Sequence, residues 1–255
     1  MLGRHDDAKQ LIGRALGSDP NHAGLHRALA RTHHLADEPE AALAAAQRSL
    51  ALQVTPEGLH LAGASQRALG DDDGAQESYR QAIRLEPESA TLRVGLALTL
   101  VAPALDRETR PADASDRLEE ARRLCEAATA LAPTLATPAY ARGLAELAAD
   151  DAPLAARWFE TAIGLDPEFA TAHRMLGTVR ARQGMSRLAS RHLATAGRLD
   201  PTDPHALSLL RRLTRPLTRR ARRRGRPDTD RVVASAREIV EADLGLRDEP
   251  PTEWA

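Results

Sequence analysis

Alanines and prolines recur along this chain at a spacing of about 34 residues. The strongest series contains only alanine. Small side chains at these positions allow two helices to approach closely, and a proline further on cannot continue a helix. The chain therefore predicts repeated helix pairs separated by turns. The three series are Ala8, Ala42, Ala75, Ala121, Ala155 and Ala189, then Ala15, Ser49, Ala82, Ala128, Ala162 and Ala196, then Pro20, Pro87, Pro133, Pro167 and Pro201.

The stretch Ala170 to Pro201 carries one complete unit, ATAHRMLGTVRARQGMSRLASRHLATAGRLDP. Leu176 and Gly177 lie in a first amphipathic run, Gly184 marks a turn, and Ala189 opens the small face of a second run. This pattern resembles a tetratricopeptide repeat (TPR), a helix–turn–helix unit of about 34 residues. The resemblance implies an all-α, right-handed α-solenoid of helix hairpins with a C-terminal capping helix. A generic alanine-rich bundle is the alternative, but it would not keep alanine and proline in register.

Within each unit, positions are numbered from 1 to 34, helix A first and helix B second. The first alanine series then falls at position 20, the second series at position 27 and the prolines at position 32. The register predicts a solenoid over residues 1–216, and an insert from roughly Pro103 to Ala114 is expected to be a loop. The predicted divisions are a half repeat 1–22, repeats 23–55, 56–89, 90–135 with the insert, 136–169 and 170–203, and a capping helix 204–216.

Two further segments follow the predicted solenoid. Residues 217–227 form an arginine-rich linker, and residues 228–255 contain an amphipathic helix and a flexible tail. The apolar stripe of that helix is expected to dock, preferably on the solenoid edge beyond Leu213, because an isolated helix of this length is marginal in water. The concave groove and a second copy of the chain are the alternative docking places.

Composition limits the compartment and the chemistry. Cys125 is the only cysteine, so no disulfide forms within the chain and a reducing compartment is expected. Lys9 is the only lysine among 35 basic residues, which suggests a GC-rich bacterial genome. The chain shows neither an apolar signal segment nor an apolar run long enough for a membrane span, so we expect a cytoplasmic protein with no membrane partner.

The resemblance implies that helices A line an inner groove, mainly through positions 2, 5, 9, 12 and 13. These positions are basic in the second, third and sixth repeats and apolar in the fourth and fifth. Such a groove would bind a protein or peptide with an apolar centre and acidic flanks. Alternatively, the arginines only reflect composition and the insert covers the apolar part. The candidate residues are Arg27, Arg31, His34, His60, Arg67, Val94, Leu98, Tyr140, Leu144, Arg174 and Arg182.

Nothing in the sequence predicts catalysis, a cofactor or a metal. His22 and His26 have helical ligand spacing, but no cysteine or carboxylate set completes a site, and the resemblance places His26 and His173 at packing positions. The run Asp71–Asp73 lacks the spacing of a calcium loop and predicts a turn. Cys125 falls at a core position. We therefore expect a protein that is not an enzyme.

An arginine cluster near the C-terminus is the feature that the resemblance does not explain. It could contact nucleic acid, anionic lipid or an acidic protein, although no aromatic residues are interleaved for base stacking. Three hypotheses follow: a protein-interaction adaptor, the repeat arm of a larger, N-terminally truncated enzyme or regulator, and, least favoured, a nucleic-acid-associated protein. Partner identity and oligomeric state stay open. The cluster consists of Arg219, Arg220, Arg222, Arg223, Arg224 and Arg226.

Overall fold

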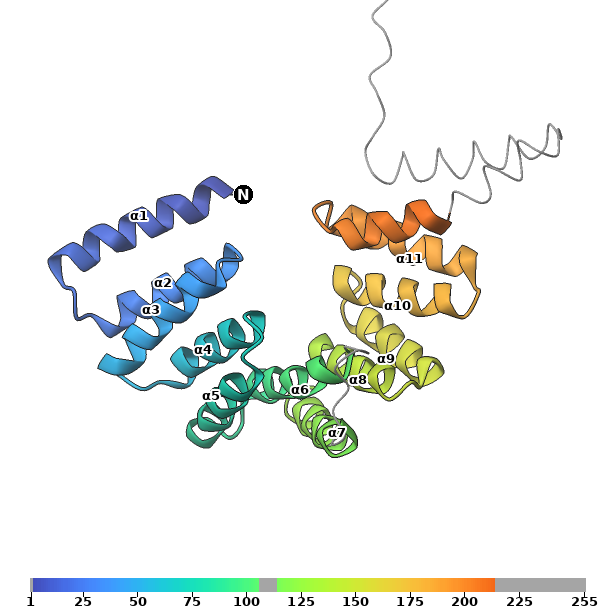
Figure 1. Cartoon of the computed structure of the whole chain (residues 1–255), viewed down its shortest axis with the longest axis horizontal. Helices are drawn as coiled ribbons and strands as arrows, with labels where there is room; N and C mark the ends of the chain where they lie inside the picture. Colours follow the sequence, from blue (N-terminus) through green and yellow to red (C-terminus); the bar gives the residue numbers. More distant parts are fainter. Residues whose placement is uncertain (1, 106–113, 214–255) are drawn as a thin grey trace, which may run out of the picture. The chain divides into compact units, whose positions relative to one another are not determined.

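The computed structural model describes residues 2–105 and 114–213, which form helices joined by turns, with no strand among them (Figure 1). The predicted all-α fold is confirmed. The chain divides into two compact units, Met1–Asp151 and Ala152–Ala255. The arginine cluster and the amphipathic helix predicted after residue 228 lie outside the described residues.

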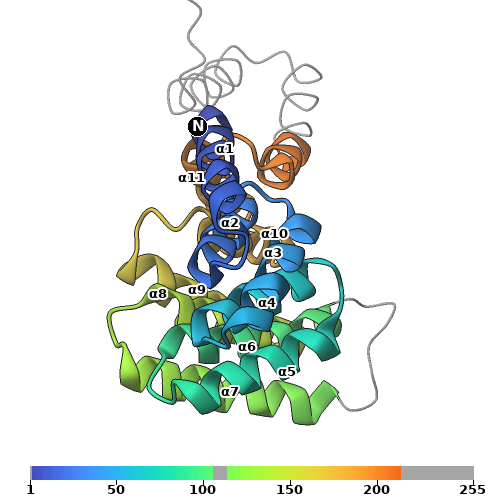
Figure 2. The ribbon, with the colours of Figure 1, turned by 90° about the vertical axis from the view of Figure 1, so that its left-hand side faces the viewer.

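Unit 1 contains three helix hairpins, with one helix before them and one after. Its helices are α1 (Leu2–Ser18), α2 (Ala23–Leu35), α3 (Pro39–Leu52), α4 (Pro56–Ala68), α5 (Asp72–Leu85), α6 (Ala90–Leu105), α7 (Ala114–Leu131) and α8 (Ala136–Ala148). The hairpins are α2/α3, α4/α5 and α6/α7, and the last two lie side by side in Figure 2. The A helices α2, α4, α6 and α8 also contact one another in succession, so they form a continuous row.

Unit 2 contains α9 (Ala152–Leu165), α10 (Ala170–Arg182) and α11 (Ser186–Leu199), and residues 204–213 are also helical. Helix α10 packs against both α9 and α11. Leu210 in the last helical stretch is 4% exposed and packs on Leu193 and Ala194 of α11. The predicted capping helix is therefore present over its described part.

The alanine series forms the contact between helices A and B. Ala42, Ala75, Ala121, Ala155 and Ala189 are each 0% exposed. Such burial without a long side chain lets the helix backbones approach each other. Larger side chains at position 24, such as Tyr79, Phe159 and Leu193, are buried and fill the space that remains. The residues of the second series behave in the same way and are at most 1% exposed, namely Ser49, Ala82, Ala128, Ala162 and Ala196.

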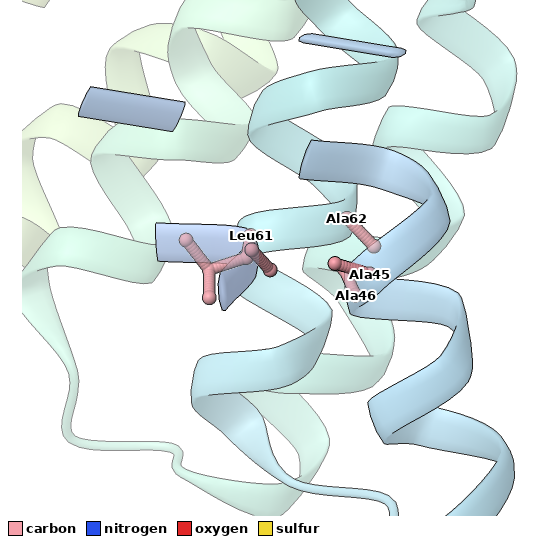
Figure 3. Close-up of a cluster of buried hydrophobic side chains, with 5 residues drawn as sticks. Ala45, Ala46, Leu61 and Ala62 are labelled. Carbon is pink, nitrogen blue, oxygen red and sulfur yellow. The ribbon is translucent and has the colours of Figure 1, made fainter. Parts of the chain in front are cut away.

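Successive hairpins are joined by the same kind of small-residue contact. Figure 3 shows Ala45 and Ala46 of α3 beside Leu61 and Ala62 of α4, all at most 7% exposed. Burying an aliphatic side chain such as Leu61 contributes about 1.5–3 kcal/mol relative to leaving it in water. The seam between α3 and α4 is thus formed by small and aliphatic side chains, whereas at the next seam the ring of Tyr79 on α5 packs against Gly95 of α6.

The turn inside each hairpin has a recurring backbone conformation. In the α2–α3 turn, Asp37 has φ 59°, its N–H donates to the His34 carbonyl, and the N–H of Glu38 donates to the His33 carbonyl at 3.0 Å. This pair of bonds defines a Schellman motif, which satisfies carbonyls left free at a helix end. The other described turns of this type have positive φ at the same register position, at Gly70, Asp150 and Gly184.

The predicted loop insert is shorter at both ends than expected. Helix α6 continues through Pro103 to Leu105, and α7 already begins at Ala114; residues 106–113 lie outside the described part. The prediction that the loop starts at Pro103 was wrong because a proline in the last turn removes only one hydrogen bond near a helix end. Ala104 is 4% exposed, so burial also favours the extra helical residues.

Candidate functional site

Two arginines of α2 share one carboxylate on α4. Arg27 Nε lies 2.8 Å from Glu57 Oε2, and Arg31 Nη1 lies 3.0 Å from Glu57 Oε1. Glu57 sits in the first turn of α4, where the helix dipole favours a negative charge. The Arg31 side chain is 60% exposed, whereas that of Arg27 is 26% exposed. One carboxylate therefore faces two guanidinium groups, and positive charge is in excess.

Three more of the predicted residues, His34, His60 and Arg67, lie on the same two helices. His34, Glu57 and Arg67 are all near enough to His60 to act electrostatically on its ring. The ring of His60 packs against Tyr79 of α5 with 5.8 Å between centroids, and burial lowers the pKa of His60. We call the set Arg27, Arg31, His34, His60 and Arg67 the α2–α4 basic surface.

The apolar candidates further along the A-helix row are mostly covered. Val94 on α6 is 5% exposed and Leu144 on α8 is 8% exposed. Leu98 and Tyr140 are half-buried. Leu98 and Tyr140 are therefore the members of the predicted apolar set with side-chain surface available to a partner.

In unit 2 the two predicted arginines differ in their surroundings. Arg174 Nε lies 2.9 Å from Oδ2 of Asp203, which precedes the last helical stretch. This ion pair ties α10 to the turn after α11. Arg182 is exposed near the end of α10, and within the described residues no carboxylate forms an ion pair with it. Arg182 is thus the better placed of the two to meet an anion.

Glu57 is a residue of the candidate site that the sequence interpretation missed. It occupies position 2 of its repeat, one of the positions that the resemblance assigns to the inner face. The signal was therefore present, but only basic and apolar residues were selected from those positions. Its pairing with Arg27 and Arg31 joins neighbouring repeats.

A buried carboxylate on α8 holds two arginines. The Glu146 side chain is 3% exposed, and its oxygens accept hydrogen bonds from Arg122 Nη2 at 2.7 Å and from Arg142 Nε at 2.6 Å. Burial alone would raise the pKa of Glu146, but the two guanidinium groups outweigh it and the pKa is lowered. Arg142 also reaches Glu126 of α7 at 2.9 Å. This network ties α7 to α8, a structural role that the sequence did not reveal.

The histidines that suggested metal spacing make hydrogen bonds in turns. Nδ1 of His22 accepts from Leu25 N–H at 3.2 Å and caps α2. His26 Nε2 lies 2.8 Å from the Pro20 carbonyl, and His173 Nε2 lies 3.2 Å from the Pro167 carbonyl. Because a carbonyl only accepts, these Nε2 atoms carry the proton. In the described part of the chain, no cluster of three or more potential ligands could hold a metal ion.

Cys125 faces the core of the α6/α7 hairpin. It is 2% exposed, and burial raises its pKa to about 12. A thiol in this environment is not a nucleophile near neutral pH. As for membranes, none of the helices in residues 2–105 and 114–213 combines the length and the apolar character of a bilayer span.

Sequence profiles agree with the register of the helices. Two tetratricopeptide-repeat profiles match the chain, one over residues 2–53 and 140–204 and the other over residues 56–89, together more than half of its length. The chain belongs to the tetratricopeptide-repeat family. Among curated proteins, none matches the sequence.

Solved structures show the same TPR fold at low sequence identity. A thermophilic TPR protein from Thermus thermophilus, TTC0263, has a TM-score of 0.69 and 20% identity over 75% of this chain and 98% of its own. Human IFIT1, solved as a dimer with PPP-AAAA, has a TM-score of 0.71 and 16% identity, over 92% of this chain and 55% of its own. The Cut9–Hcn1 hetero-tetramer of the APC/C contains a chain with a TM-score of 0.65 and 17% identity, over 83% of this chain and 40% of its own.

Proposed function

We propose that this TPR protein is a non-enzymatic scaffold that binds a partner peptide on its row of A helices. The α2–α4 basic surface is the observation that carries the proposal. Two guanidinium groups there share the single carboxylate of Glu57, so the surface retains positive charge for acidic residues of a partner. Leu98, on the next A helix α6, is half-buried and offers apolar surface to the same partner.

A binding role, rather than catalysis, fits the reactive side chains of the described residues. Cys125 is buried with a raised pKa, and His26 and His173 donate to proline carbonyls. The thiol is buried, and each histidine Nε2 is engaged by a backbone carbonyl, so these groups hold the fold. The lone cysteine also supports a cytoplasmic location as part of this proposal.

Glu57 gives the proposed surface an internal competitor. A partner carboxylate that binds Arg31 must displace or share the Glu57 interaction, because one guanidinium group offers a limited set of donors. Exposed ion pairs contribute only about 0.2–1 kcal/mol each, so the exchange is energetically accessible. The scaffold would then prefer partners with several acidic residues over partners with one.

The test is a selection from a random peptide library with the intact chain as bait. The proposal predicts selected peptides that carry several Asp or Glu residues next to an apolar residue. The binding of one such peptide to the Arg31→Glu variant should be weaker, and less sensitive to salt, than its binding to the wild-type chain.

A matched control is Arg84→Glu. Arg84 lies on the B helix α5, its side chain is 63% exposed, and it also pairs with one carboxylate, that of Glu77. The two variants therefore lose a similar arginine from different surfaces. Equal losses of affinity, or selected peptides without acidic residues, would refute the proposed surface.

A further inference from the structure

Helix α1 leaves open the face that the other B helices bury. Ala8, Leu11 and Ala15 of α1 occupy positions 20, 23 and 27 of the repeat register. At positions 20 and 27, the other described repeats contain residues that are at most 1% exposed. In α1, however, Ala8 and Ala15 are half-buried and Leu11 is 64% exposed. We call Ala8, Leu11 and Ala15 the α1 open face.

The uncovered position of Leu11 is unusual within this chain. The equivalent residue in the next repeat, Ala45, is 7% exposed, and those of the later repeats are half-buried. Lys9 of α1 pairs with Glu38, in the turn after α2, at 2.8 Å, and helical spacing places Ile12 and Leu16 on the same side of α1 as Lys9. The open face is therefore a second apolar side of α1 that its contact with α2 does not use.

We propose that a second copy of this chain covers the α1 open face through antiparallel pairing of the two α1 helices. Ala8 and Ala15 are seven residues apart with Leu11 between them, which is the spacing of a helix–helix seam. The two small residues allow close approach, so Leu11 of one copy packs beside Ala8 of the other. The inference is independent of peptide binding, which uses other helices.

Charged residues beside the seam select the antiparallel orientation. Asp7 and Arg14 are both exposed, lie one heptad apart on the side of the seam away from α2, and form no ion pair within the described residues. In an antiparallel pair, Asp7 of each copy meets Arg14 of the other. In a parallel pair, the Asp7 and Arg14 side chains of the two copies would lie on opposite sides of the seam, so this attraction would be absent.

The expected association is weak and reversible. Helix α1 has 17 residues and is therefore about 25 Å long, so one helix against one helix gives a contact at the low end of interface sizes, below about 1,200 Å² in total. Self-association should accordingly depend on protein concentration rather than give a permanent dimer.

The experiment is sedimentation of the full chain across a wide concentration range. Wild-type protein is expected to move from monomer toward dimer as its concentration rises, and Leu11→Glu is expected to abolish the dimer. Leu35→Glu is the matched control, because Leu35 at the end of α2 is also 64% exposed but lies off the α1 open face. Helical circular dichroism checks that both variants are folded.

A charge-swap pair tests the orientation. Asp7→Arg and Arg14→Asp should each weaken homodimers by roughly three- to thirtyfold, since each removes two attractive pairs. An equimolar mixture of the two variants should restore a dimer that contains one copy of each, because opposite charges then face each other.

Several results would overturn the proposal. A wild-type chain that stays monomeric at all concentrations would refute it, and so would a dimer unaffected by Leu11→Glu. A monomer that Leu11→Glu destabilises would show that another part of the same chain covers the face. A dimer that survives Leu11→Glu would also leave peptide binding untouched, so the two proposals fail separately.

Discussion

At the scale of single residues, the tight turns depend on one backbone conformation. Asp37 has φ 59° and Gly70 has φ 80° at equivalent places in consecutive hairpins. A residue with a Cβ pays a steric penalty in this left-handed region, which aspartate tolerates better than most and glycine does not incur. The exposed Asp37 side chain makes no compensating contact that would favour aspartate there within the described structure.

We therefore expect Asp37→Gly to stabilise the protein by about 0.5–1 kcal/mol, the relief of backbone strain exceeding the entropy added to the unfolded chain. The reverse change, Gly70→Ala, should destabilise by about 1 kcal/mol, because a Cβ there meets no atom within 4 Å and the cost is purely conformational. Urea unfolding of both variants measures this. If both variants were more stable than the wild type, or both less stable, the turn assignment would be contradicted.

At the scale of helices, small residues decide how closely the members of a hairpin approach. Ala189 of α11 is 0% exposed, and a Cβ added at Gly177 of α10 would lie 3.2 Å from the Ala189 carbonyl oxygen. Ala189→Leu should therefore overpack this crossing and cost about 1–3 kcal/mol. Ala44→Leu, on the exposed side of α3, should change the melting temperature little. Similar effects of both would mean that the crossing has room for a larger side chain.

The ion-pair network between α7 and α8 is a second element-scale device. Glu146→Gln should destabilise the protein by about 2–3 kcal/mol, because it leaves two partly buried arginines with a neutral partner. Glu126→Gln is the control, since Glu126 contacts only Arg142 in this network and is 68% exposed. Thermal unfolding distinguishes the two. If Glu126→Gln lowered the stability as much as Glu146→Gln, the buried Glu146 carboxylate would not be the centre of the network.

The stabilisation by Glu146 should depend on pH. Its pKa in the folded protein is lowered below the ordinary value of 4.5, so its stabilisation is complete above that value. As pH falls below 4.5 and through the folded pKa, the carboxylate is protonated and the contribution is lost. The difference in unfolding free energy between wild type and Glu146→Gln should accordingly shrink in acid. A constant difference down to low pH would contradict the charged assignment.

Much of this element-level organisation could be predicted from the sequence. The alanines at position 20 and the prolines at position 32 set the hairpin register because both act locally, through close packing and through the missing proline N–H. The extent of α6 could not be predicted, because the burial of Ala104 that favours helix beyond Pro103 arises from tertiary packing. The network around Glu146 likewise depends on which helices meet.

At the scale of the whole molecule, the candidate site was only partly predictable. The register correctly brought Arg27, Arg31 and His60 to neighbouring A helices, but it could not reveal the burial of Val94 and Leu144, which depends on packing around them. Glu57 neutralises part of the charge of Arg27 and Arg31, and this could be seen only from the way neighbouring repeats pack. The candidate surface is therefore more polar than the sequence pattern indicated, and more of its charge is paired within the chain.

The central claim is that the α2–α4 basic surface binds acidic residues of a partner in competition with Glu57. Calorimetric titration of one library-selected acidic peptide into wild type and into Glu57→Gln tests it most directly. The account predicts tighter binding by Glu57→Gln, by a few-fold to about tenfold, because Arg27 and Arg31 lose their internal counter-ion. Unchanged or weaker binding by Glu57→Gln would contradict it.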